Sequence, residues 1–163
     1  MNPSTADLRA FAAHDHAHCR SRALAAAEER CRARRLRLTP ARATALEALL
    51  ESHRAMTAYE LLDRLREAGH GGQPPVVYRA LAFLVENGFA HRIERLGAYV
   101  ACTGEGAHPA AFMVCRACRA VAETALDVEP GLAERASAFG FVPERTVVEV
   151  EGLCARCAAT AAA

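Results

Sequence analysis

The sequence predicts an α+β fold with two domains, and three observations support this class. Residues 22–87 contain segments whose apolar side chains recur at helical spacing, whereas residues 89–102 read as two short strands. Residues 103–109 hold two glycines and end in a proline, which is typical of a hinge. Residues 110–163 return to short strands and carry four of the seven cysteines in two Cys-x-x-Cys pairs.

The first two helices are expected after a flexible N-terminal arm at 1–21. Residues 22–36 are rich in alanine and arginine and predict the first helix. The second helix begins at Thr39 and Pro40, because threonine can cap a helix and proline needs no amide hydrogen in the first turn. Its buried stripe is expected to comprise Leu46, Leu49, Leu50 and His53.

Two further helices follow. Thr57 and Glu60 have the spacing of a capping box at the start of the third helix, and Gly69 suits the left-handed position after its end. A pair of prolines opens the fourth helix at 74–87, because proline fits the first turn. The residues that share its apolar face are Val77, Leu81, Leu84 and Val85.

A β-hairpin completes the N-terminal domain, 22–102. Residues 89–94 and 98–102 predict its two strands, and a turn containing Gly97 joins them. Helices followed by a hairpin are the element order of a winged helix, in which the third and fourth helices form the helix-turn-helix.

The C-terminal domain, 110–163, is predicted to be a small α/β unit. Residues 112–114, 120–123 and 146–151 predict strands, and residues 130–139 predict a helix. A domain of fewer than 60 residues is marginal alone and needs a metal or a partner subunit. We therefore expect a zinc-containing dimerisation domain and a homodimer.

Charge is distributed unevenly along a chain whose formal net charge is +1. Residues 1–97 carry 15 arginines and 11 acidic residues, a balance of +4, whereas residues 98–163 carry 5 arginines and 8 acidic residues, a balance of −3. A GC-rich genome is an alternative reason for the absence of lysine, but it does not explain this clustering. Because the arginine fork matches phosphates and guanine edges, the N-terminal domain is the candidate DNA-binding part.

Several classes of protein are not indicated. No apolar stretch of about 18 residues predicts a membrane span, and the N-terminus does not resemble a secretory signal. An odd number of cysteines argues against a disulfide framework. We expect a cytoplasmic protein without a membrane partner or a small-molecule substrate, whose cysteine pairs bind metal.

The two cysteine pairs predict a structural zinc site. Four thiolates suit tetrahedral zinc, and redox-active cysteines are the alternative. Such a site has no open position for a substrate, so we expect no catalysis there. The four predicted ligands are Cys115, Cys118, Cys154 and Cys157.

A second group of metal-ligating residues is weaker by spacing alone. His91 and Cys102 fall on the two strands of the hairpin, His108 falls in the hinge, and Glu123 follows the first cysteine pair. One sulfur, two nitrogens and one oxygen suit zinc, although lone histidines and glutamates are commonly surface residues. A hydrolytic zinc enzyme is a rival, but four protein ligands leave no position for the attacking water.

Several motifs in one order resemble the ferric uptake regulator (Fur) superfamily. The segment LRLTPAR at 36–42 is similar to its opening motif, PPVVYRAL at 74–81 is similar to its recognition-helix motif, and the two Cys-x-x-Cys pairs match its structural zinc site. The resemblance extends from about residue 24 to 157 and implies a dimeric winged-helix regulator. The N-terminal run of His14, His16, His18 and Cys19 has no counterpart that the resemblance assigns.

Within the superfamily, the sequence is most similar to the zinc uptake regulators. That resemblance rests on His91 in FAH, Cys102 in YVAC, His108, and Glu123 in CRAVAE. It implies two zinc ions per subunit and a zinc-loaded form that represses zinc-uptake genes through palindromic operators. A regulator of iron, peroxide or nickel is an alternative, although a thiolate ligand disfavours iron(II) and histidines are sparse.

Five residues are candidate DNA contacts. Arg79 is expected on the exposed face of the recognition helix, where it can reach a base. Tyr78 borders that face, and Tyr59 lies on the preceding helix. Arg37 and Arg42 are candidate phosphate contacts, with solvated surface charge as the alternative. A zinc-stabilised interaction module without DNA binding is a further alternative for the whole chain.

Overall fold

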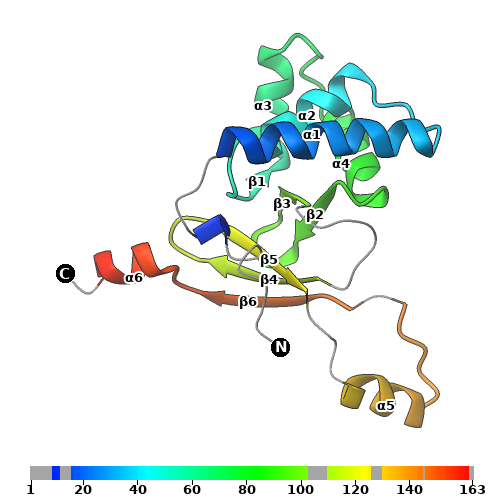
Figure 1. Ribbon diagram of the computed structural model, residues 1–163, viewed down its shortest axis with the longest axis vertical. Coiled ribbons are helices and arrows are strands. Elements are labelled where there is room, and N and C mark those ends of the chain that lie inside the picture. Colours follow the sequence, from blue (N-terminus) through cyan, green and yellow to red (C-terminus); the bar gives the residue numbers. More distant parts are fainter. Residues whose placement is uncertain (1–8, 12–15, 103–109, 126–129, 145, 162–163) are drawn as a thin grey trace.

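The computed structural model describes residues 9–11, 16–102, 110–125, 130–144 and 146–161. Figure 1 shows a cluster of helices above a sheet that crosses the lower half of the molecule, with a small hairpin between them. The helices of the upper cluster are α1 (His16–Ala33), α2 (Pro40–Leu50), α3 (Ala58–Glu67) and α4 (Pro74–Glu86).

Helices α2, α3 and α4 pack around one apolar core. Its largest fully buried side chains are leucines, each of which stabilises the fold by about 2 kcal/mol. Part of α1 and the start of the hairpin also pack against this core. The buried leucines are Leu49, Leu61, Leu65, Leu81 and Leu84.

The predicted helix boundaries depend on local chemistry that the structure contains. The capping box at α3 is complete, because Glu60 donates its amide to the Thr57 hydroxyl and the Glu60 carboxylate accepts from the Thr57 amide. Gly69 has a φ of +79°, as a left-handed C-terminal position requires. At α2, Pro40 occupies the first turn, but the Thr39 side chain makes no capping hydrogen bond.

The hairpin forms a three-stranded sheet in the order β1-β3-β2. Strands β2 (Ala90–Ile93) and β3 (Ala98–Ala101) confirm the predicted hairpin, and a 3-10 turn (Glu94–Leu96) joins them. The short strand β1 (Met56–Thr57), which precedes α3, pairs with β3. We call β2, this turn and β3 the wing.

The C-terminal sheet has the order β5-β4-β6. Strands β4 (Ala110–Cys115) and β5 (Val121–Ala125) are antiparallel, and β6 (Val148–Gly152) runs parallel to β4. Helix α5 (Pro130–Ala138) lies in the connection from β5 to β6, the two strands that flank β4 and run in opposite directions. A last helix, α6 (Ala155–Ala161), follows β6.

A second apolar core joins the two sheets. From the N-terminal half it takes Ala55 and three residues of the wing, including Ile93, which is fully buried. From the C-terminal sheet it takes Phe112, Val114 and Val121. The wing is therefore packed against β4 and β5.

Several predicted helix boundaries and positions also differ from the structure, and α1 ends at Ala33 where the sequence predicted a helix to residue 36. Residues 16–21, expected in the flexible arm, belong to α1, because an alanine-rich helix without a breaker extends beyond its predicted start. Residues 9–11, also expected in the arm, form a 3-10 turn. His53 is not on the stripe of α2, which ends at Leu50; the chain that follows pairs with the C-terminal half.

In the described part of the chain, apolar side chains at α5 are exposed. Leu132 in α5 and Phe139 directly after it are exposed, Phe139 to 88%. Helix α6 was not predicted, since its alanine-rich sequence is only seven residues long.

Candidate metal centres and nucleic-acid interface

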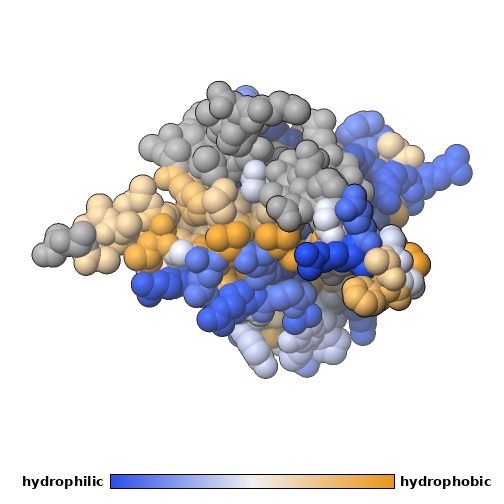
Figure 2. Space-filling model, turned by 90° about the horizontal axis from the view of Figure 1, so that it is seen from below, coloured by the Kyte–Doolittle hydropathy of each residue, from blue (hydrophilic) through white to orange (hydrophobic). Residues whose placement is uncertain are grey.

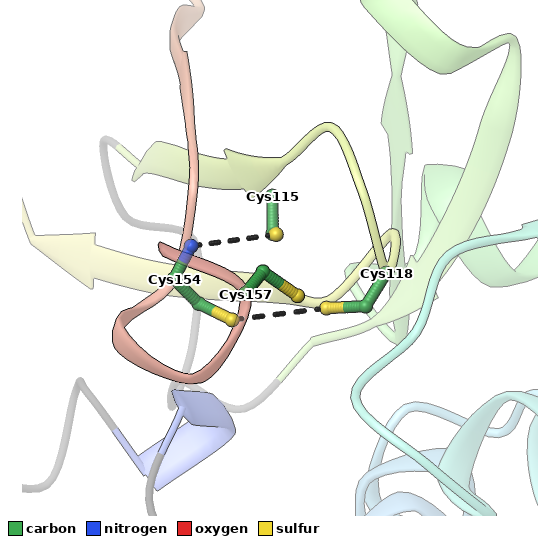
Figure 3. Close-up of side chains that lie close together, drawn as sticks. All are labelled: Cys115, Cys118, Cys154 and Cys157. Atoms are coloured by element: carbon green, nitrogen blue, oxygen red, sulfur yellow. Dashed lines mark hydrogen bonds between the residues drawn. The ribbon is translucent and has the colours of Figure 1, made fainter. Parts of the chain in front are cut away.

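The two Cys-x-x-Cys pairs meet in space. Cys115 ends β4 and Cys118 lies in the turn towards β5, while Cys154 and Cys157 lie at the start of α6. The four sulfur atoms lie within 4.8 Å of one another (Figure 3). The chain thus brings together all four residues predicted from sequence.

This arrangement fits a tetrahedral zinc ion. With zinc–sulfur bonds of about 2.3 Å, two sulfurs of a tetrahedron are about 3.8 Å apart. The Sγ atoms of Cys118 and Cys154 are 3.9 Å apart. The Cys154 amide also donates to the Cys115 Sγ at 3.4 Å, as expected beside a thiolate.

The thiols influence one another strongly. Burial raises the pKa of Cys115, but hydrogen bonds from the backbone amides of Cys154, Cys118 and Ala117 lower it by more. The net effect is a pKa of about 6. Hydrogen bonding with Cys154, together with the other thiols, raises the pKa of Cys157 to about 12. Without a cation the cluster therefore retains protons, and a dication is what allows four thiolates to coexist.

Apolar groups enclose the cysteine cluster. Ala120 and Leu153 pack against it, and so does Phe11 from the N-terminal 3-10 turn. Cys115 and Cys154 are themselves buried. A four-cysteine set in such a setting is suited to stabilising a fold, because it offers no exchangeable position.

A second group of candidate ligands lies between the wing and β5. His91 of β2, Cys102 directly after β3, and Glu123 of β5 have ligand atoms within 4.8 Å of one another. The His91 Nε2 is 2.9 Å from the Glu123 Oε1, and the Cys102 Sγ is 3.9 Å from the same oxygen. His108 lies outside the described residues, so its part in this site stays a prediction.

The environment of this second site is mostly buried. Glu123 is 8% exposed, and the His91 ring packs against Phe112 with centroids 5.0 Å apart. Burial lowers the pKa of His91, but hydrogen bonds and charges from Cys102 and Glu123 outweigh it and raise the pKa to about 9. A buried carboxylate such as that of Glu123 requires a positively charged partner, and either the protonated His91 ring or a metal ion can supply that charge. Nitrogen, sulfur and oxygen donors together fit zinc.

The candidate DNA contacts on α3 and α4 are exposed. Tyr59 is 73% and Tyr78 50% exposed, and Arg79 is exposed on the same helix as Tyr78. Exposed aromatic side chains of this size are typical of a binding surface, and their position on the helix-turn-helix fits nucleic acid as the partner. The predicted face of α4 is thus available.

The two arginines near α2 have different surroundings. Arg37 is exposed, whereas the Arg42 guanidinium lies 3.8 Å from the centroid of the Phe83 ring and donates to the Arg37 carbonyl at 2.6 Å. Arg42 thus contributes a cation–π contact to the fold, which the sequence did not indicate. Arg30 behaves similarly: it lies over the Phe89 ring and donates to the Asn87 carbonyl.

Cysteines and histidines outside the two candidate metal sites also have places in the structure. Cys31 is buried in the helical core, and burial raises its pKa, as expected of a packing residue. His14 lies outside the described residues, while His16, His18 and Cys19 fall in the first turn of α1. The His53 carbonyl accepts the Val121 amide. The helices of the described chain are too short or too polar to cross a membrane.

Sequence reasoning missed the polar contacts that join the two halves. Glu149 of β6 accepts the amides of Glu94 and Arg95 at the tip of the wing, at 2.7 and 2.9 Å. Arg119 reaches Glu60 of α3 at 3.1 and 3.0 Å. The alternating acids of β6 were visible in the sequence, but nothing local identifies their partners.

Comparison with known proteins places the chain in a family. A model described as the ferric uptake regulator family matches residues 33–150. The chain belongs to this family. The zinc uptake regulation protein of Escherichia coli (strain K12) is 42% identical over 137 residues, which cover 82% of this chain and 80% of that protein. The protein of the same name from Shigella flexneri matches equally.

Solved structures agree with this assignment. A zinc uptake regulator complexed with zinc and DNA has a TM-score of 0.83 and 40% identity, covering 88% of this chain and 98% of that chain. The holo form of XcZur has a TM-score of 0.75 and 45% identity, covering 83% and 96%. The predicted α+β class, with a winged helix before an α/β domain, is thereby confirmed.

Proposed function

We propose that this chain is a zinc-dependent transcriptional repressor that binds operator DNA of zinc-uptake genes. Its relatives are named for zinc uptake regulation, and one similar protein was solved with zinc and DNA bound. The family is one of transcription regulators, which is not an enzyme class. The observation that carries the proposal is the group of His91, Cys102 and Glu123, whose members come from both halves of the chain.

The position of this second site explains how a metal can act on DNA binding. His91 belongs to the wing, which follows the recognition helix α4, and Cys102 directly follows the wing, whereas Glu123 belongs to the C-terminal sheet. When bound, zinc would supply the charge that holds these donors together, with His108 as the proposed fourth ligand. His91 and Cys102 then orient the wing, and through it α4, relative to β5. The arrangement with the donors assembled is favoured over others by the metal's differential affinity.

The cysteine cluster is proposed to hold a structural zinc ion, giving two ions per subunit. Cys115 ends β4 and Cys118 lies in the turn to β5, whereas Cys154 and Cys157 follow β6. These side chains connect the first and last parts of the C-terminal sheet. We propose the domain division 22–102, 103–109 and 110–163, with metal sites within and at the boundary of the last part.

The DNA-binding surface is proposed to lie on α3 and α4. Arg79 would contact a base edge, and Tyr78 and Tyr59 would contact bases or backbone beside it. Arg37 is a candidate phosphate contact; Arg42 is retained as a weaker one, because Phe83 and the Arg37 carbonyl already engage its guanidinium. A regulator of this kind works in the cytoplasm, where its thiols stay reduced.

Homodimerisation is proposed through the C-terminal domain. Exposed apolar side chains gather on α5, the residues that follow it, and β6, and an isolated chain gains nothing by exposing them. Figure 2 shows the face seen from below, where apolar groups form a band that hydrophilic groups border along its lower side. A two-fold dimer would set the two recognition helices on successive major grooves of a palindrome. The exposed residues are Leu132, Phe139, Phe141, Val142 and Val150.

The proposal is tested by DNA binding at controlled free zinc. Fluorescent promoter DNA of a zinc-uptake gene from the same genome is titrated with wild type and with Cys102→Ser, at fixed salt. We expect wild type to bind only with zinc, and Cys102→Ser to lose this response while it retains one tightly bound zinc. Equal binding by both proteins with and without zinc would overturn the proposal.

A further inference from the structure

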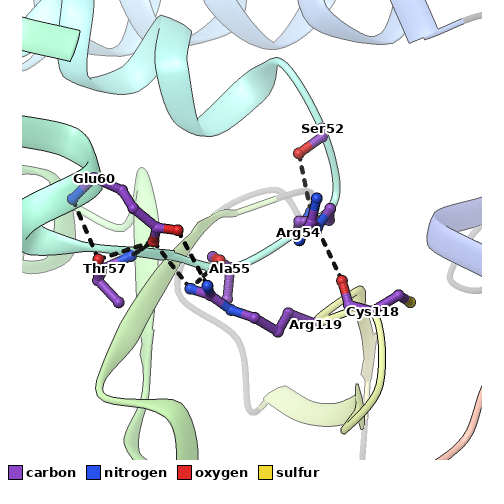
Figure 4. A network of polar contacts seen from close by, with 7 residues as sticks. All are labelled: Ser52, Arg54, Ala55, Thr57, Glu60, Cys118 and Arg119. Atoms are coloured by element: carbon purple, nitrogen blue, oxygen red, sulfur yellow. Dashed lines mark hydrogen bonds and ion pairs between the residues drawn. The ribbon is translucent and has the colours of Figure 1, made fainter. Parts of the chain in front are cut away.

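The turn that carries the first cysteine pair is hydrogen-bonded to the N-terminal half. The chain between α2 and β1 runs antiparallel to the residues after Cys118 (Figure 4). The Ala55 amide donates to the Arg119 carbonyl at 3.0 Å, and the Arg54 Nε donates to the Cys118 carbonyl at 2.9 Å. We call this set of contacts the seam. It connects the proposed structural metal site directly to the segment that leads into the helix-turn-helix.

Arg119 makes the strongest contacts of the seam. Its Nη1 and Nη2 donate to the two carboxylate oxygens of Glu60 at 3.1 and 3.0 Å, and Nη2 also donates to the Ala55 carbonyl at 2.9 Å. A two-pronged arginine–carboxylate pair fixes direction as well as distance. Hydrogen bonding from Arg119, and then from Thr57, lowers the pKa of Glu60 to about 2, so Glu60 is charged at neutral pH.

The backbone of Arg119 depends on the metal-binding turn. Its φ is +62°, in the left-handed region that side chains other than glycine rarely adopt. The Arg119 amide donates to the Cys115 carbonyl at 2.8 Å, which closes the turn between the two cysteines. The turn that presents Cys115 and Cys118 to a metal therefore also presents Arg119 to Glu60.

Glu60 is in turn a structural part of the DNA-binding unit. It is the acidic member of the capping box that begins α3. Helix α3 packs against α4, the proposed recognition helix, through buried Leu61 and Leu65. A contact that fixes the position of Glu60 therefore also fixes the position of α3 and, through their shared core, of α4.

From these contacts we infer that Arg119 is a positioning residue that ties the orientation of the helix-turn-helix to the cysteine metal site. The inference rests on the proposed function. One attachment, at the wing, leaves a domain free to pivot, whereas a second attachment on α3 fixes its orientation. The cysteine site then has two roles, because it stabilises the C-terminal sheet and it positions Arg119, which orients α3.

The test is a double-mutant cycle with Glu60→Gln and Arg119→Gln in the full-length protein. Glutamine at position 60 keeps the capping box but loses the ion pair. Arg116→Gln is the matched control, because Arg116 is an exposed arginine in the same turn and its loss removes the same charge. The readouts are the free-zinc midpoint for DNA binding, the retained zinc per chain, and hydrogen exchange of the segment 52–60.

We expect each single variant to raise the zinc midpoint about three- to fivefold, the size of a partly exposed ion pair, and the double variant to add nothing further. Hydrogen exchange at 52–60 should rise in all three, with one tightly bound zinc retained, while Arg116→Gln behaves as wild type. The inference is overturned if the two single effects add, if Arg116→Gln has the same effect, or if 52–60 exchanges as in wild type. Hydrogen exchange is measured without DNA, so failure of the proposed function alone leaves that readout interpretable.

Discussion

Replacing Glu149 by alanine removes the carboxylate that holds the tip of the wing against β6. The two lost hydrogen bonds, to the amides of Glu94 and Arg95, are 2.7 and 2.9 Å long. Bonds to a charged group contribute about 1.5–3 kcal/mol when buried, and we take about 1 kcal/mol each because Glu149 is only half-buried. The arrangement with the wing docked on β6 should then lose about 2 kcal/mol, or about 30-fold in population.

This loss should appear mainly in the response to zinc. At saturating zinc the docked arrangement stays dominant, so the DNA affinity of Glu149→Ala should fall only a few-fold. Near the midpoint the same loss must be compensated by metal binding, so the free-zinc midpoint should rise by up to about 30-fold. Fluorescence anisotropy of labelled operator DNA in zinc buffers measures both quantities.

Glu151→Ala is the control for this prediction. Glu151 lies two residues along β6 and contacts the wing through the Arg95 side chain, at 2.9 Å, where Arg95 is 66% and Glu151 36% exposed. Such a pair contributes less than about 1 kcal/mol, so the midpoint should move less than about fivefold. An unchanged midpoint in Glu149→Ala, or an equal shift in Glu151→Ala, would show that the Glu149 carboxylate does not hold the wing against β6.

Three further predictions concern stability. Phe112→Ala should destabilise the zinc-loaded protein by about 3 kcal/mol in urea unfolding, because Phe112 is 3% exposed in the core between the sheets; a loss below about 1 kcal/mol would contradict that packing. The lowered pKa of Glu60 contributes stability above its ordinary value of 4.5, and that stability is lost as the pH falls through about 2. Because Glu60 is 47% exposed, the effect is discounted to about 1 kcal/mol, and the pH dependence of Glu60→Gln should be flatter than that of wild type over this range. Chelation strong enough to empty the cysteine cluster should expose four thiols to a thiol reagent and destabilise the C-terminal sheet, and thiols that react equally with and without chelator would exclude a metal there.

Features that depend on neighbouring residues were predictable from the sequence. The capping box of Thr57 and Glu60 and the left-handed Gly69 use side chains a few positions apart, so the boundaries of α3 follow from local chemistry. The clustering of the four cysteines follows from two short spacings that each bring two sulfurs together. In contrast, grouping His91 and Cys102 with Glu123 needed the family resemblance, since spacing alone left them ambiguous.

The contacts between the halves could not be predicted in this way. Arg119 and Glu60 are 59 positions apart in the sequence, and Glu149 and Glu94 are 55 positions apart. Each pair meets because the wing packs against the C-terminal sheet through the second apolar core. The surroundings of Arg42 also depend on packing, because Phe83 approaches it from another helix. In the sequence these residues look like ordinary charged surface residues, and their partners are known only once the chain is folded.

The most direct test of the account is the zinc affinity of the second site with and without operator DNA. If the His91, Cys102 and Glu123 site controls DNA binding, linkage requires that operator DNA tighten zinc binding there by the same factor by which zinc tightens DNA binding. Competition with a chromophoric chelator, on protein whose cysteine cluster is already loaded, measures this factor. We expect equal factors of about fivefold or more in wild type and no such coupling in Cys102→Ser. A zinc affinity that DNA leaves unchanged in wild type would contradict it.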